Sequence, residues 1–483
     1  MAGGGDTVAQ ESKSARCKSP QLGGFRAHVT DTPASFGQDA RRPFDGMPIP
    51  SRGRSTASGV DRISGLPEGV IHHVLSLLPA HDAVRTSVLA RRWRHLWSFA
   101  PGLRVTGVKG WRSSDKFVDF VERLLSLRRG GATLEWFEFQ LDPSDFDFKF
   151  RSYELAEELR GWIGRALGCN VRALRLSLED INMADFRLGT PPLFSQHLTR
   201  LEVDRVRTMY SVLDLSGCPM LVEMKMEYCF IESDEMSSAS LKKLTMIECD
   251  FRRETWDKRT RISLPSLTSL ELTLRSGRAP LLGSMPSLES AIVSLNYGCE
   301  DYYKCDEDSY DGSQYYYKSD DDCTSCILLN GLSEATHLQL SSYSDVFVFS
   351  QDVKQCPKFT NLKTLVLSDW CFAADLNALI CFLQHSPTLE ELTLQLSELP
   401  ECSLEQGNYK LLEPSYVSHH LKVVVIKCEE VDGKVQKILK TLSAYGIPVS
   451  ILSALASPTA RDKKIWDVII PILKCTMNFV SVM

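Results

Sequence analysis

A recurring leucine pattern is the feature that most constrains how this 483-residue chain can fold. The spacing Leu-x-x-(Leu/Met)-x-(Leu/Met) starts at Leu221, Leu241, Leu267, Leu362 and Leu389, and looser versions start at Leu134, Val171, Leu198, Leu288, near Ala335 and at Leu421. Most neighbouring starts lie 20 to 32 residues apart, which is the period of short units that stack side by side. Because each unit covers its leucines only with its neighbours, the pattern predicts one array with a continuous core.

A proline two residues before the first leucine supports the same register. It stands in CPMLVEMKM, LPSLTSLEL, MPSLESAIV and SPTLEELTL. Proline fixes its own φ and keeps its predecessor extended, which suits a turn that leads into a strand. Residues 152–168 (SYELAEELRGWIGRALG) interrupt the pattern, and their apolar spacing predicts an amphipathic helix between two early units.

The residues that alternate with the leucines are expected to face outward, because successive side chains of a strand point to opposite faces. Candidate target-facing positions are therefore Glu223, Lys225, Lys243, Thr245, Ser269, Glu271, Thr364, Val366, Glu391 and Thr393. Their chemistry is mixed: both charges, hydroxyl groups and a valine are present. A mixed surface of this kind suits a protein partner better than a single small ligand.

The stretch at 66–97, LPEGVIHHVLSLLPAHDAVRTSVLARRWRHLW, has a different texture. Pro67 is expected at the start of a first helix and Asp82 at the N-cap of a second, since both residue types suit those positions. Apolar residues recur at helical spacing and include Val70, Ile71, Val74, Leu75, Leu78, Val84, Val88, Leu89, Trp93, Leu96 and Trp97. So short a segment cannot cover that apolar surface alone, so other parts of this chain or a partner must cover it.

Charge is concentrated in one segment. The chain has a formal charge of −6, and the stretch from Glu300 to Asp322 holds nine acids and two lysines, a local charge of −7 that leaves about +1 elsewhere. A chain that is otherwise near neutral gives no reason to expect a nucleic-acid partner. The acidic stretch lacks leucine, and we interpret it as a solvated insertion that lengthens the step between two units.

Cysteines offer a candidate metal site in the same region. Cys299, Cys305, Cys323 and Cys326 are spaced C-x5-C-x17-C-x2-C, but a zinc motif would pair two short-spaced couples and only CTSC qualifies. The run DEDSYDGS resembles a calcium loop, yet its glycine is displaced and no glutamate closes it. We therefore expect no metal and no other cofactor.

Fifteen cysteines, several inside aliphatic runs such as MEYCF, indicate free thiols in a reducing compartment, hence the nucleus and/or cytoplasm. Residues 1–60 are rich in Gly, Ser, Pro, Asp and Arg and are expected to be disordered. The apolar tail after Ile465 is interrupted by Asp467, Pro471 and Lys474, so no membrane span is expected.

The stretch from Asp61 to about Leu103 resembles an F-box, a helical motif that docks on the Skp adaptor of cullin-based ubiquitin ligases. DRISGLPEGVIHHVLSLLP, HDAVRTSVLA and RRWRHLW carry this resemblance. Carried over position by position, it implies an adaptor interface made of Leu66, Pro67, Ile71, Leu75, Leu78, Val88, Trp93 and Trp97. The other interpretation is that these residues pack against the first units of the same chain.

The array resembles the leucine-rich repeats of plant F-box proteins, and HHLKVVVIKCEEVDGKVQKILKTLSAYGI at 419–447 resembles their C-terminal FBD module. The expected fold is α/β: a three-helix F-box followed by an irregular solenoid, with parallel strands on one face and helices or loops on the other. The expected parts are a leader at 1–60, the F-box at 61–105, the array at 106–402 with an insertion at 299–323, an FBD-like module at 403–447 and an unassigned tail at 448–483.

The resemblance implies a non-catalytic subunit of an SCF-type E3 ubiquitin ligase. Its partners would be a Skp-family adaptor, through it a cullin and a RING subunit, and an unknown protein substrate. No phosphate loop, nucleophile elbow or catalytic Cys/His frame stands in the sequence. The alternative is a leucine-rich-repeat scaffold acting outside a ligase. A small-molecule receptor would need a basic pocket, and the strands show no clear basic cluster.

Overall fold

A computed structural model describes residues 65–453 with gaps, of which the longest are 142–151, 302–325 and 397–419. The chain divides into two compact units, Met1–Pro43 and Phe44–Met483, and all described residues belong to the second. The expected leader at 1–60 and most of the expected tail lie outside the described residues. Within the described ranges, no helix is both long enough and apolar enough to cross a membrane.

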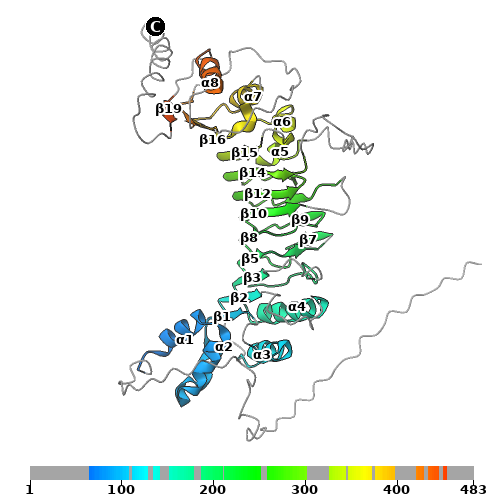
Figure 1. Cartoon of the computed structure of the whole chain (residues 1–483), viewed down its shortest axis with the longest axis vertical. Helices are drawn as coiled ribbons and strands as arrows, with labels where there is room; N and C mark the ends of the chain where they lie inside the picture. Colours follow the sequence, from blue (N-terminus) through cyan, green and yellow to red (C-terminus); the bar gives the residue numbers. More distant parts are fainter. Residues whose placement is uncertain are drawn as a thin grey trace, which may run out of the picture. The chain divides into compact units, whose positions relative to one another are not determined.

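The second unit is built on one sheet in which all thirteen strands pair in parallel (Figure 1). In sheet order the strands are β1 (Gly102–Thr106), β2 (Trp136–Leu141), β3 (Ala173–Leu178), β5 (Arg200–Asp204), β8 (Glu223–Glu227), β10 (Lys243–Phe251), β12 (Ser269–Gly277), β14 (Ser290–Cys299), β15 (His337–Ser342), β16 (Thr364–Leu367), β17 (Glu391–Gln395), β18 (Val423–Cys428) and β19 (Ser450–Ser453). Neighbours in the sheet follow one another along the chain, apart from short strands outside it. This is the architecture of a leucine-rich-repeat solenoid.

Each predicted unit is confirmed, and its strand begins two residues after the first residue of the pattern. Leu221 is followed by β8 at Glu223, and Leu389 by β17 at Glu391. The register is set just before each strand, where two successive amides reach back to one carbonyl of the preceding unit. Thus the backbone N–H groups of Val222 and Glu223 both donate to the Thr199 carbonyl, at 2.9 and 3.1 Å.

The leucines of the pattern form one continuous core, and the layer behind them changes along the sheet. Behind the first strands lie α3 (Ser114–Ser126) and α4 (Ser152–Gly168), and α4 confirms the helix predicted at 152–168 (Figure 1). A second parallel sheet follows, made of β7 (Val212–Asp214), β9 (Glu235–Ser237), β11 (Arg261–Ser263) and β13 (Leu281–Leu282), with a small pair β4 (Arg187–Leu188) and β6 (Arg207–Thr208) before it. Helices take over after β14: α5 (Leu329–Leu332), α6 (Val348–Val353), η5 (Asp369–Phe372), α7 (Asn377–His385) and α8 (Gly433–Ala444).

The N-terminal segment forms α1 (Glu68–Leu77), α2 (Ala80–Arg85) and two 3-10 helices, η2 (Thr86–Val88) and η3 (Arg91–Phe99). Pro67 stands at the N-cap of α1, one residue before the predicted position. Asp82 is not an N-cap: Pro79 occupies that position, and Asp82 lies inside α2, where its carboxylate accepts a hydrogen bond from Arg85 at 3.1 Å. The expected helical F-box is present, and its part after Pro79 is divided into α2, η2 and η3.

Two predicted boundaries shift because strands join the main sheet. β1 pairs with β2 from Gly102, so the sheet begins before the predicted end of the F-box at 105. At the other end β18 pairs with β17 and β19 with β18. The FBD-like segment thus continues the array, and part of the expected tail belongs to it as well.

The buried side chain of Asp301 holds the backbone in place just before the acidic insertion. Only 1% of its side chain is exposed, and its carboxylate accepts hydrogen bonds from Arg259 at 2.8 Å on both oxygens and from the backbone N–H of Ala279 at 2.8 Å. Burial opposes ionisation, but the neighbouring Arg259 and Arg278 guanidinium groups hold the pKa of Asp301 below its usual value. The predicted insertion at 299–323 therefore begins too early, since Cys299 and Asp301 are buried parts of the array.

Asp352 secures the chain where it returns from the insertion. Its carboxylate is fully buried on α6 and accepts the backbone N–H groups of Ile327, Leu328 and Leu329 at 2.7, 2.7 and 2.9 Å. These are amides at the start of α5, which would otherwise lack acceptors. Two buried carboxylates thus hold the two ends of a segment, 302–325, that lies outside the described residues.

Candidate functional site

Half of the predicted adaptor-contacting residues are enclosed by this chain. Ile71 and Leu75 are each 1% exposed, and Trp93 and Trp97 each 6%. All four belong to the continuous core, which also includes Leu103 and Val105 of β1. For these four, burial supports the other interpretation, packing within the chain: they hold the helices together and against β1, and they leave little apolar surface for a partner.

The other predicted contacts divide in a different way. Leu66, Pro67 and Val88 are exposed, and Val88 is 86% accessible. Leu78 is half-buried and packs against the core. The guanidinium of Arg92 donates a hydrogen bond of 3.0 Å to the Leu66 carbonyl, which fixes the start of α1 against η3. These residues therefore remain candidates for contact with an adaptor.

An exposed apolar stripe on α1 was missed as an interface in the sequence. Val70, Val74 and Leu77 are 46%, 45% and 52% exposed, and their spacing places them on one helical face. Leu89 after η2 is also largely exposed. Sequence periodicity placed Val70 and Val74 among the apolar positions, but it could not tell which of two adjacent stripes the chain itself covers.

The ten predicted target-facing residues lie in two rows across the sheet. Strand register puts Glu223, Lys243, Ser269, Thr364 and Glu391 in one row and Lys225, Thr245, Glu271, Val366 and Thr393 in the next. Leucines and methionines alternate with them and are buried. Thr245 differs from the prediction, since only 7% of it is accessible and its neighbours leave it little to offer a partner.

Across the first half of this face, from β1 to β10, runs a continuous series of ion pairs that we call the ion-pair ladder. Arg104, Glu138, Arg175, Glu202, Arg200, Glu223 and Lys243 follow one another in it, with N–O distances of 2.6, 3.8, 3.6, 2.6, 3.6 and 3.0 Å. Each acid lies between two cations. The charges thus satisfy one another, and they offer a partner little net field.

The second half, from β12 to β18, we call the neutral face. Its two rows are completed by Ser290, Ile292, His337, Gln339, Val423 and Val425. Ile292 and Val423 are 37% and 40% exposed. Tyr297, at the end of β14, is exposed and meets Tyr343 edge to face with 6.2 Å between ring centroids. Exposed aliphatic and tyrosine side chains on a rigid sheet suit a protein interface.

The cysteines considered for zinc in the sequence do not form a site among the described residues. Cys299 and Cys326 are buried and free, and Cys305 and Cys323 lie outside the described ranges. Burial raises the pKa of both Cys299 and Cys326 to about 12, so these thiols keep their protons at neutral pH. A different group of residues, Cys356, Cys381 and His385, brings three possible ligand atoms together.

Comparisons with known proteins agree with this geometry. Residues 63–101 match the model of the F-box domain, and that match ends one residue before β1. An F-box/LRR-repeat protein of Arabidopsis thaliana is 26% identical, with 69% of this chain and 69% of the relative covered. An FBD-associated F-box protein of the same plant is 25% identical, with 78% and 86% covered. The meiotic F-box protein MOF of Oryza sativa subsp. japonica is 26% identical, with 69% and 71% covered.

F-box domains in general bind Skp-type adaptors, and the relatives' names combine the three elements found here. The helices at 68–99 end where the sheet starts, the sheet has the leucine-rich-repeat pattern, and β18, α8 and β19 extend it. The chain therefore carries an F-box domain, and over most of its length it is similar to plant F-box proteins with leucine-rich repeats and an FBD segment.

Proposed function

We propose that this chain is the substrate-recruiting, non-catalytic subunit of an SCF-type E3 ubiquitin ligase. The exposed apolar stripe of the F-box carries this proposal: Val70, Val74 and Leu77 on α1, together with Leu66 and Val88. The F-box would dock on a Skp-family adaptor, and through it on a cullin and a RING subunit. Ubiquitin transfer would be done by those partners, so this chain would contribute proximity alone.

The stripe is left exposed by the core that the described residues form. Ile71 and Leu75 already fill the side of α1 that faces η3 and β1. Val70, Val74 and Leu77 then add three aliphatic side chains on the adjacent side of the helix, at helical spacing. Contiguous exposed apolar surface on a soluble domain marks a binding site, and anchors in a small interface each contribute about 2 kcal/mol.

For target recognition we propose the neutral face, where Ile292, Val423 and Tyr297 are exposed. The target would be a protein, since a flat sheet of mixed chemistry offers broad contact. We also propose the nucleus and/or cytoplasm as its location. The ten cysteines in the described ranges that are assigned as free thiols support a reducing compartment.

The test is binding of a purified Skp adaptor to the full chain. Val74→Asp/Leu77→Asp should weaken binding thirtyfold or more, because it places two charges in a desolvated interface. Val222→Asp is the matched control, since Val222 is a valine of similar exposure on the array. Undiminished binding of the α1 variant would overturn the assignment of the stripe.

Trp93→Ala separates direct from indirect contributions. Its side chain is enclosed by the chain, so loss of adaptor binding should be accompanied by a lower melting temperature. The α1 variant should lose binding with its melting temperature unchanged. The alternative function is a scaffold acting outside a ligase. A chain that binds its target but never co-purifies with a cullin would support the scaffold.

A further inference from the structure

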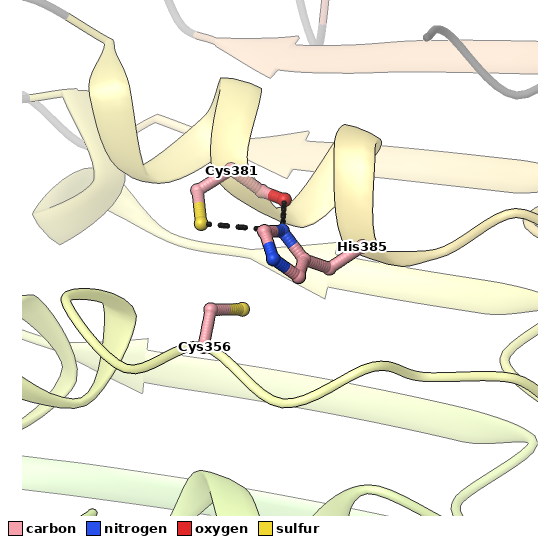
Figure 2. Close-up of side chains that lie close together, drawn as sticks. All are labelled: Cys356, Cys381 and His385. Carbon is pink, nitrogen blue, oxygen red and sulfur yellow. Dashed lines mark hydrogen bonds between the residues drawn. The ribbon is translucent and has the colours of Figure 1, made fainter. Parts of the chain in front are cut away.

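Three side chains that can ligate a metal meet behind the neutral face. Cys381 and His385 lie one turn apart on α7, and Cys356 lies in the loop after α6. One ligand atom from each of the three lies within 4.8 Å of the others, and all three residues are half-buried. Figure 2 shows the imidazole of His385 beside both thiol groups. Three soft or borderline donors thus converge from two separate elements.

The spacing is close to that of a tetrahedral zinc site. Zinc binds thiolate sulfur at about 2.3 Å and imidazole nitrogen at about 2.0 Å, which places neighbouring ligands roughly 3.5–3.8 Å apart. Cys381 Sγ lies 3.5 Å from Nδ1 of His385, so the thiol and the ring are in direct contact, and one ligand atom from each of the three residues lies within 4.8 Å of the others. A bound zinc would draw the three ligand atoms together to the shorter distance. Thiolate and imidazole donors favour zinc over magnesium or calcium, which prefer oxygen.

The histidine is oriented as in known metal sites. Its Nδ1–H donates to the Cys381 carbonyl at 2.9 Å, drawn as a dashed line in Figure 2. This hydrogen bond keeps the proton on Nδ1 and leaves the lone pair of Nε2 for a metal. The backbone is also fixed, since the N–H of Phe359, three residues after Cys356, donates to the His385 carbonyl at 2.9 Å.

The pKa values of the two neighbouring thiols shift in opposite directions. A hydrogen bond from the Cys356 thiol stabilises the Cys381 thiolate and lowers the pKa of Cys381. The same hydrogen bond, together with burial, raises the pKa of Cys356. Zinc binds both sulfurs as thiolates, so a bound Zn²⁺ must displace the proton that Cys356 holds.

We propose that Cys356, Cys381 and His385 bind one zinc ion, which ties the loop after α6 to α7. On binding, Zn²⁺ replaces the thiol protons, and up to two protons are released to solvent per ion. Two thiolates balance its charge, His385 supplies the third ligand, and water takes the fourth position. This inference is independent of the proposed ligase function, and it departs from the expectation that the chain needs no metal.

The experiment uses the full chain, stripped of metal by a chelator under reducing conditions and then titrated with Zn²⁺. We expect one retained equivalent of zinc, a melting temperature raised by about 3–5 °C in excess zinc, and no effect of Mg²⁺. Co²⁺ should give a thiolate-to-metal absorption band. The double variant Cys356→Ser/Cys381→Ser should weaken zinc binding at least a hundredfold. The single variant His385→Gln should weaken it at least tenfold.

Cys169→Ser is the matched control, because Cys169 is another free, half-buried cysteine, at the end of α4. It should keep the full equivalent of zinc. Circular dichroism of the metal-free variants shows whether each one folds. Three results would overturn the proposal: no zinc retained by the reduced wild type, equal loss in the Cys169 variant, or zinc retained by the folded double variant.

Discussion

The two halves of the sheet face share one backbone and differ in what they offer to a partner. From β1 to β10 the outward rows hold the ion-pair ladder, in which each acid is bracketed by arginine or lysine. From β12 to β18 the same rows hold serine, threonine, histidine, glutamine, isoleucine and valine, with Glu271 and Glu391 as the acids of those rows. The register continues across the change, because inward leucines set it.

This difference separates two kinds of position in one repeat. Leucines at the pattern positions of the described sheet are buried, apart from the half-buried Leu421, so they determine the fold. The residues between them affect the core little, so their side-chain chemistry can differ between the two halves. In the first half they neutralise one another, and in the second they leave aliphatic groups exposed. We therefore assign the solvent face of the second half to recognition.

The largest expected effect lies at the junction of the halves. Asp301→Ala should lower the free energy of unfolding by about 3–5 kcal/mol, because the buried Arg259 loses its carboxylate. Urea unfolding measures this. Since the pKa of Asp301 is lowered in the folded chain, its contribution is present above the ordinary aspartate pKa and is lost as pH falls through the folded value. The variant should lose less stability than the wild type over that range.

Asp214→Ala is the control for this substitution. Asp214 is exposed at the end of β7, and its carboxylate accepts hydrogen bonds only from its neighbour Ser216 among the described contacts. Its replacement should cost less than about 1 kcal/mol. Equal costs for the two variants would show that the Asp301 cluster does not join the two halves.

The comparison is tested directly by charge substitutions on each half. Ile292→Asp/Val423→Asp should reduce target capture more than tenfold, because it charges the exposed aliphatic groups of the neutral face. Arg175→Gln, which alters an exposed member of the ion-pair ladder, should change capture less than about threefold. Proximity labelling with the proteasome blocked, quantified against the wild type, measures both. Similar losses from both variants would remove the distinction between the halves.

Much of the sheet could be predicted from the sequence, because each strand needs buried residues at the same positions and the leucine pattern therefore repeats with every strand. Leu221, Leu362 and Leu421 each precede a strand by two residues. The boundaries at Gly102 and Asp301 could not be predicted in the same way. Both depend on pairing with distant residues, with β2 in one case and with Arg259 in the other.

The candidate sites were harder to predict than the fold. Periodicity finds the apolar residues of α1, but it does not show that Ile71 faces β1 while Val74 faces solvent. Nor does it show that Cys356 meets Cys381, because their contact depends on how α7 packs beside α6. The pair Cys381 and His385, four residues apart on a helix, was the one local signal for the metal-ligating group.

A smaller effect is expected within the ion-pair ladder. Glu138→Gln removes the acid between Arg104 and Arg175, at 2.6 and 3.8 Å, and should cost about 0.5–1 kcal/mol. The cost should shrink in 1 M salt, where charges on the surface are screened. Urea unfolding at low and high salt measures it. Gln339→Glu, the reverse change on the neutral face, is the control. A cost for Glu138→Gln that is independent of salt would mean that packing, not charge, stabilises the first half.

The smallest effect is expected where the chain's charge is most concentrated. Residues 302–322 hold seven acids and two lysines, and we expect a neutral Gly/Ser linker of equal length in their place to change the free energy of unfolding by less than about 0.5 kcal/mol. The reason is that Asp301 and Asp352 hold the flanking chain through their own hydrogen bonds, with Arg259 and with the amides at the start of α5. Equal length keeps loop closure constant, so the substitution tests composition alone. Thermal unfolding of the two proteins, at low and at high salt, measures the difference. A melting temperature lowered by more than about 5 °C would mean that residues of the replaced segment themselves stabilise the junction between the two halves.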